Sequence, residues 1–173
     1  MMKQLWCLVA LGAALLSPYA VHAVVTVRYE HAEQYKDLGL SGSTTPSIQA
    51  DLMKQCEAHF KALGERYLPK DETLEIVVLD VDMAGAYEPW RTPNLTNTRI
   101  IRDIYPPKFS LHYRWHDKNG ALKADKQDAV SDLNYLMRLD SRQYQDNDPL
   151  RYEKTLLDRW FCERFFSTGQ ATP

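Results

Sequence analysis

The most hydrophobic stretch after the N-terminal segment runs from Leu74 to Met83, and it predicts a central β-strand. Val77, Leu79, Val81 and Met83 alternate with a second set, Ile76, Val78, Asp80 and Asp82. Successive side chains of a strand point to opposite faces of the sheet. One face is therefore expected to be apolar throughout, whereas the other begins apolar and becomes acidic. We expect this strand to start inside the protein and to emerge at the rim of the sheet.

Further segments with a period of two predict the rest of the sheet. Residues 24–30 alternate Val25, Val27 and Tyr29 with polar positions, and residues 108–116 alternate Phe109, Leu111, Tyr113 and Trp115 with polar ones. Asp117-Lys118-Asn119-Gly120 is typical of a hairpin turn, so residues 121–131 are expected to return antiparallel to the preceding strand. Residues 99–104 are read as a short edge strand.

Two segments have helical spacing. Thr45-Pro46 resembles an N-cap followed by proline, and the apolar stripe Ile48, Leu52, Cys56, Phe60 and Leu63 ends near Gly64. Asp148-Pro149 opens a second helix with the stripe Leu150, Leu157, Phe161 and Phe165. The elements together predict a single α+β domain of order β-α-β-β-β-α. About four strands form an antiparallel or mixed sheet, and both helices pack on one face of it.

Residues 1–23 are interpreted as a secretory signal peptide. Lys3 precedes an uncharged apolar run from Leu5 to Leu16, and Val21-His22-Ala23 places small residues before a cleavage site. The apolar run is shorter than the roughly 20 residues needed to span a bilayer. We therefore expect cleavage after Ala23, no membrane span in the mature chain, and a periplasmic or secreted location.

Residues 24–173 have the length of one domain, with a tail after about residue 166 that we expect to be disordered. The net charge is −2 and charges of both signs are interspersed. The absence of a basic stripe argues against a nucleic-acid partner. The sequence points to no cofactor, and it does not specify an oligomeric state.

Two cysteines, Cys56 and Cys162, remain after removal of the signal peptide, which carries Cys7. In an oxidising compartment they are candidates for a disulfide that links the two helices. Such a bridge would contribute about 4–5 kcal/mol if unstrained. Two reduced, buried thiols are an equally good interpretation.

The acidic end of the central strand is the first candidate site. Asp80 and Asp82 are expected roughly 7 Å apart on one side of the strand, where they would attract a cation or a basic partner. Asp132 could join them at the same rim, which would give a metal-dependent hydrolase. Turn bonding is the simpler role for Asp132. The Asp80-Val81-Asp82 motif also resembles the nucleophile of haloacid dehalogenase-like phosphatases, but the other motifs of those enzymes do not follow downstream.

A proline-bracketed loop follows, and it contains Trp90 and Arg91. An aromatic ring beside a guanidinium group suits stacking on a ligand or peptide, and it equally suits a buried loop anchor. Trp90 and Arg91 are therefore the second candidate binding site.

Four motifs in order carry a family resemblance: Leu79-Asp80-Val81-Asp82-Met83-Ala84-Gly85, Glu88-Pro89-Trp90-Arg91, residues 131–137 (SDLNYLM), and Pro149-Leu150-Arg151-Tyr152-Glu153-Lys154 with the elements that follow. Together with the signal peptide they resemble the exported bacterial proteins of domain-of-unknown-function family 3016. The resemblance implies a Gram-negative envelope setting and supports a strand over residues 121–131. It implies no particular activity.

The sequence therefore favours a non-enzymatic periplasmic protein that binds another protein or an envelope component through the sheet rim and residues 87–91. A metal-dependent hydrolase is the alternative function, and a purely structural envelope protein is the third.

Overall fold

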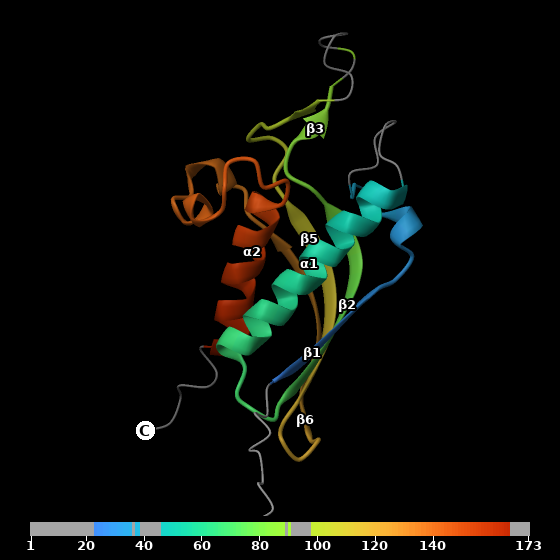
Figure 1. Cartoon of the computed structure of the whole chain (residues 1–173), viewed down its shortest axis with the longest axis vertical. Coiled ribbons are helices and arrows are strands. Elements are labelled where there is room, and N and C mark those ends of the chain that lie inside the picture. The colour runs from blue at the N-terminus through green and yellow to red at the C-terminus, as the bar shows by residue number, and fades with distance from the viewer. Residues whose placement is uncertain (1–22, 36, 39–45, 89, 91–97, 167–173) are drawn as a thin grey trace, which may run out of the picture.

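A four-stranded sheet with two helices on one face forms the body of the protein (Figure 1). The computed structural model describes residues 23–35, 37–38, 46–88, 90 and 98–166. The sheet has the order β1-β2-β5-β6. Its strands are β1 (Val24–Tyr29), β2 (Thr73–Asp82), β5 (Lys108–His116) and β6 (Leu122–Ser131). This confirms the predicted α+β fold.

The sheet is mixed because of a single crossover. β1 pairs parallel with β2, and the connection between them contains α1 (Pro46–Tyr67). β2 pairs antiparallel with β5, and β5 pairs antiparallel with β6. β2 therefore occupies the central position that its hydrophobic sequence predicted. At the β5–β6 turn, Asp117 accepts the Gly120 N–H at 2.9 Å through its carbonyl oxygen.

A bulge at Leu79 changes the predicted alternation of β2. Val78 lies opposite Leu111, but the next paired residue is Asp80, opposite Ser110. The extra residue moves Val81 to the same face as Leu74, Ile76 and Val78, where all four are buried. The prediction that Val77, Leu79 and Val81 share one continuous apolar face was therefore wrong.

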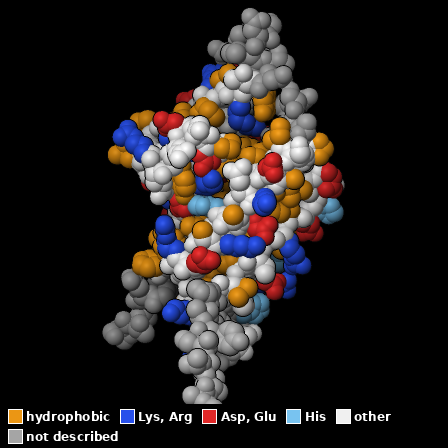
Figure 2. Space-filling view, in the orientation of Figure 1, with side chains coloured by type: hydrophobic (Ala, Val, Ile, Leu, Met, Phe, Trp, Pro, Cys, Tyr) orange, Lys and Arg blue, Asp and Glu red, His pale blue; other side chains and the backbone are white. Residues whose placement is uncertain are grey.

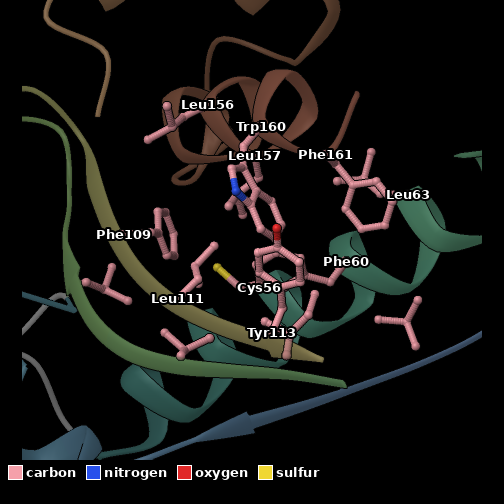
Figure 3. Close-up of a cluster of buried hydrophobic side chains, with 14 of the residues drawn as sticks. Cys56, Phe60, Leu63, Phe109, Leu111, Tyr113, Leu156, Leu157, Trp160 and Phe161 are labelled. Atoms are coloured by element: carbon pink, nitrogen blue, oxygen red, sulfur yellow. The ribbon is translucent and has the colours of Figure 1, made fainter. Parts of the chain in front are cut away.

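The hydrophobic core fills the space between the sheet and the two helices (Figure 3). α2 (Arg151–Phe161) continues into a short π-helical segment, Cys162–Phe166. Cys56, Phe60 and Leu63 of α1 meet Leu157, Trp160 and Phe161 of α2 over β5. Phe60 and Trp160 pack edge to face with centroids 6.2 Å apart, an arrangement that adds to simple area burial. The two helices run in similar directions, each starting at the end of the molecule nearer the small β3–β4 pair (Figure 1).

The opposite face of the sheet is polar. Ser110, His112 and Arg114 alternate with the buried residues of β5. His112 lies 2.6 Å from Asp125 of β6, and Arg114 lies 3.0 Å from Glu75 of β2. Cross-strand contacts between polar side chains of this kind suit a face in contact with solvent.

A separate two-stranded sheet lies at one end of the molecule. Ala86–Tyr87 (β3) pairs antiparallel with Arg99–Ile100 (β4) and extends beyond the main sheet (Figure 1). The strand expected at residues 99–104 is thus two residues long and does not join the edge of the main sheet. Short 3₁₀ turns occupy Ala32–Gln34, Tyr135–Met137 and Asp140–Gln143.

None of the helices within the described ranges combines the length and the hydrophobicity that a membrane span requires. The interpreted signal peptide up to His22, the capping residue Thr45, Arg91 and the tail from residue 167 lie outside the described residues.

Candidate binding cleft

A cleft of about 700 Å³ lies where the end of β2, the small β3–β4 sheet and both helices meet. Its lining comes from four places: Ile48, Asp51, Leu52 and Gln55 of α1, Met83 and Ala84 after β2, Tyr87, Arg99 and Ile101 of the small sheet, and residues 146–149 and 151–153 around the start of α2. In Figure 2, hydrophobic, acidic and basic side chains lie together over this region between α1 and the start of α2.

One wall is the N-terminal part of α1. Ile48, Asp51, Leu52 and Gln55 follow the i, i+3, i+4, i+7 spacing of a single helical face. The apolar stripe of α1 therefore leaves the core at its N-terminal end and continues into the cleft. Ile48, predicted as a core residue, is 47% exposed for this reason.

Glu153 is a buried carboxyl group at the cleft, on the first turn of α2. Only 1% of the residue is exposed, and its Oε1 accepts a hydrogen bond of 2.7 Å from the backbone N–H of Ala84. Burial raises the pKa of Glu153 to about 7, although the Ala84 hydrogen bond and nearby Arg99 act in the opposite direction. A carboxyl group with this pKa exchanges its proton near neutral pH.

Arg99 connects the small sheet to the main body. Its Nη2 donates to both carboxylate oxygens of Asp37, at 2.7 and 2.6 Å, and its Nη1 donates to the carbonyl of Gly85 at 2.9 Å. Its guanidinium lies over the ring of Tyr87, 4.9 Å from the centroid. The bidentate pair neutralises the charge of Arg99 and fixes its orientation at the cleft.

The segment before α2 has two more internal ion pairs. Arg151 donates to Asp146 at 2.6 Å, and Lys154 donates to Asp148 at 2.6 Å. Asp148 also accepts the backbone N–H of Leu150, so it holds the start of α2 in place. The Nε of Arg151 is buried and has no hydrogen-bond partner among the described residues.

The pairing of these groups leaves the cleft with excess negative charge. Arg99, Arg151 and Lys154 each face a carboxylate, at Asp37, Asp146 and Asp148 respectively. Within the described ranges, no such ion pair involves Asp51 or Glu153, and both line the cleft. Asp51 is exposed on α1, whereas Glu153 is buried.

Asp80 and Asp82 lie elsewhere, on the open face of the sheet. They border a smaller hollow of about 240 Å³ together with Lys108, Ser110 and Ser131. Lys108 Nζ lies 3.6 Å from Asp82, and Asp80 accepts the N–H of Val81 at 2.9 Å. The sequence correctly placed these two residues together, and the structure adds a lysine as neighbour.

Asp132 belongs to a different group. It accepts hydrogen bonds from Arg138 at 2.9 Å and from Arg159 at 3.0 Å, and Arg159 is on α2, which covers the opposite face of the sheet. Burial alone would raise the pKa of Asp132, but the arginines and the Asn134 N–H lower it below its usual value. Among the described residues, no three His, Cys, Asp or Glu side chains could hold a metal ion together. The three-carboxylate site considered for a hydrolase therefore has no support.

Trp90 is 73% exposed, which excludes its interpretation as a buried anchor. It follows β3 and is accessible to a partner. Its neighbour Arg91, the other candidate in this loop, lies outside the described residues.

The candidate disulfide is not formed, and both Cys56 and Cys162 are free thiols. Cys56 is buried and interacts electrostatically with Glu153 near the start of α2. Cys162 follows the last residue of α2, more than two turns further along. Because the two helices run in similar directions, the cysteines sit at different levels of the helix pair.

Sequence reasoning missed the cleft residues Asp51, Arg99, Arg151 and Glu153, and it missed Asp37, the ion-pair partner of Arg99. One signal was present for Glu153, because it lies four residues before Leu157 and three after Leu150 on the buried stripe of the helix. A carboxylate on a core-facing stripe is rare and calls for a specific partner or role.

Comparison with known proteins gives one match. The model of the family described as "Protein of unknown function (DUF3016)" matches residues 23–163. No curated protein and no solved structure matches the chain.

Proposed function

The chain belongs to the DUF3016 family, and on the basis of its cleft we propose that it is a binding protein of the bacterial cell envelope. The observation that carries this proposal is the cleft of about 700 Å³ beside the buried carboxyl of Glu153. Its volume lies within the range of small-molecule sites, and it combines apolar walls with a few oriented polar groups.

The construction of the cleft favours binding over a structural role. Glu153 is buried in the first turn of α2, where an apolar residue would pack at lower cost. Arg99 is held by Asp37 and Gly85 in a fixed orientation at the cleft. Burying and orienting these polar groups costs folding free energy. Because an accessible cavity lies beside them, the arrangement suits recognition of a ligand.

The end of β2 at the sheet rim remains part of this proposal, but through the residues that follow the strand. Met83 and Ala84 follow the end of β2 and line the cleft, and Tyr87 belongs to the segment that the sequence singled out. The proposed ligand site thus lies beside the rim on the helix side of the sheet. Asp80 and Asp82 lie on the other side.

Export to the periplasm is the second part of the proposal, supported by the charge and hydropathy pattern of residues 1–23. The test is expression of the full chain in a Gram-negative host, followed by osmotic shock and intact-mass analysis. We expect a periplasmic product that begins at Val24. Retention of residues 1–23, or recovery only from the cytoplasm, would overturn this part.

The cleft itself is tested with a pair of matched substitutions. Ile48→Trp places a large ring at the cleft, whereas Ile104→Trp makes the same change at an exposed isoleucine that does not line it. Protein purified from the periplasm is denatured, and released small molecules are identified by mass spectrometry. We expect a molecule bound to the wild type and to Ile104→Trp but reduced in Ile48→Trp. Equal recovery from all three proteins would argue against the cleft as the binding site.

A further inference from the structure

We propose that the cleft recognises a primary aliphatic amine, whose ammonium group pairs with Glu153 and whose carbon chain lies between α1 and the small sheet. This inference rests on the proposed binding function and specifies its ligand class. Three observations support it: the charge remaining in the cleft, the chemistry of its walls, and the position of its buried carboxyl.

The remaining charge is negative. Among the described residues, the basic groups in and around the cleft are each engaged by a carboxylate at 2.6 Å, in the pairs Arg99–Asp37, Arg151–Asp146 and Lys154–Asp148. Asp51 and Glu153 have no comparable basic partner in the described part of the chain, although both line the cleft. Above the pKa of Glu153, which is about 7, both groups are carboxylates, and they favour a cation and disfavour an anion.

The walls between these two carboxylates suit an aliphatic chain. Ile48 and Leu52 come from α1, and Met83 and Ile101 come from the residues that follow β2 and β4. Ile48 and Ile101 are 47% and 41% exposed, so a ligand would bury apolar surface that is now in contact with water. A compact inorganic cation would leave this surface uncovered.

Glu153 provides a buried counter-ion. Its Oε1 accepts a hydrogen bond from the N–H of Ala84, which orients it, and only 1% of the residue is exposed. Among the described residues, three other charged or titratable groups act on or near it: Arg99 of the small sheet, Asp37 of the segment that bridges to Asp82 of β2, and Cys56 of α1. Arg99 and Asp37 offset one another, so an ammonium group would supply the missing positive partner.

One feature of the cleft points to a second contact. The Nε–H of Arg151 is buried and finds no hydrogen-bond partner within the described ranges, and Arg151 lines the same cleft. An acceptor on the ligand, such as a hydroxyl or an amide carbonyl, would satisfy this donor. Ligands that carry both an amine and a neutral acceptor should therefore bind more tightly than a simple alkylamine.

The test compares probes with the same apolar chain and different head groups. Binding of n-hexylamine, hexanoate and 1-hexanol to the mature protein is measured by titration calorimetry near pH 8, where Glu153 is ionised. We expect hexylamine to bind at least about tenfold more tightly than hexanol, and hexanoate to bind least. Equal binding of all three, or preference for hexanoate, would overturn the ligand class.

Substitutions test whether the ammonium group pairs with Glu153. Glu153→Gln keeps an acceptor for Ala84 but removes the charge, and we expect hexylamine affinity to fall at least about tenfold while hexanol binding is unchanged. Asp51→Asn should reduce affinity about two- to fivefold, because Asp51 is exposed. Glu57→Gln is the matched control, since Glu57 is also on α1 but pairs with Lys61 outside the cleft. An unchanged affinity in Glu153→Gln would remove Glu153 as the counter-ion.

The pH dependence gives an independent readout. The ammonium probe binds ionised Glu153, so its affinity should rise about tenfold between roughly pH 6 and pH 8 in the wild type. Glu153→Gln should not show this rise. A wild-type affinity that does not change with pH over this range would contradict the assignment.

Two further probes distinguish the source of the amine. 1,5-Diaminopentane represents a free polyamine, and N-acetyl-lysine amide represents a lysine side chain of a protein. Tighter binding of 1,5-diaminopentane would identify the ligand as a small free amine. Tighter binding of N-acetyl-lysine amide would identify it as a lysine side chain of a protein segment. If no amine binds but the periplasmic protein releases another small molecule in a cleft-dependent manner, the ligand class fails while the binding function stands.

Discussion

The carboxylate of Glu153 and the backbone N–H of Ala84 form a hydrogen bond of 2.7 Å between residues 69 positions apart. This bond joins the first turn of α2 to the residue that follows the central strand and Met83. It places a carboxyl group with a pKa of about 7 at the junction of the main sheet, the small sheet and both helices. The stability of this junction should therefore depend on pH.

Glu153→Gln should make the protein less sensitive to pH. The pKa of Glu153 is raised from 4.5 to about 7 on folding, so the folded state binds this proton more tightly than the unfolded state. The resulting stabilisation is fully present below about pH 4.5 and is lost as the pH rises through 7. Between roughly pH 4 and pH 8, the wild type should lose about 3 kcal/mol more than the variant. Urea unfolding at a series of pH values measures this difference, and parallel curves for the two proteins would contradict it.

Arg99→Ala should destabilise the protein by about 3 kcal/mol, because it leaves the largely buried carboxylate of Asp37 without its bidentate partner. Arg99→Lys should not restore the loss fully, since an ammonium group cannot make both hydrogen bonds in the same plane. Chemical denaturation provides the measurement. Arg114→Ala is the control, because its pair with Glu75 is exposed and should contribute at most about 1 kcal/mol. Equal losses of stability in Arg99→Ala and Arg114→Ala would show that the buried pair contributes no more than the exposed one.

Gly85→Ala and Gly120→Ala should differ strongly, although both glycines have a positive φ, of 78° and 80°. A Cβ at Gly85 would lie 2.6 Å from the carbonyl oxygen of Ile100, whereas a Cβ at Gly120 would meet nothing within 4 Å. Gly120→Ala should cost about 1 kcal/mol from backbone strain alone. Gly85→Ala should cost about 3 kcal/mol or more, because the small sheet must shift. The melting temperatures of the two variants measure this difference. Similar melting temperatures would contradict the steric clash expected at Gly85.

The two cysteines of the chain from Val24 should react differently with a thiol reagent. Cys56 is 2% exposed, and burial raises the pKa of its thiol to about 12, so it should be unreactive in the folded protein. Cys162 is partly exposed and should be modified slowly. After denaturation without reductant, both thiols should titrate. If denatured protein yields no thiols until it is reduced, the cysteines are bridged.

The sequence predicted the fold well because the relevant signals are local. The two-residue period of β5, its turn at Asp117–Gly120 and the stripe of α1 each lie within one segment, and each element formed where it was expected. The β2 faces were predicted wrongly because the bulge at Leu79 depends on how β2 pairs with β5. A single inserted residue reverses the alternation, and the residues of β2 alone do not reveal it.

The candidate site was only partly accessible to sequence reasoning. Asp80 and Asp82 were correctly grouped, because they are neighbours on one strand. The grouping with Asp132 failed because Asp132 pairs with Arg138 and Arg159. The pairing of Arg99 with Asp37 spans 62 positions and involves no recognisable motif.

The amino-acid sequence by itself determined the four strands of the main sheet, the two helices that cover it, and the family to which the chain belongs. Only the tertiary structure decided that the cleft exists and that Glu153, Arg99, Asp51 and Arg151 surround it. The physical reason is that periodicity reports the burial of one segment at a time. A cavity and its charge depend on which segments meet and on which ionised groups neutralise one another when they do.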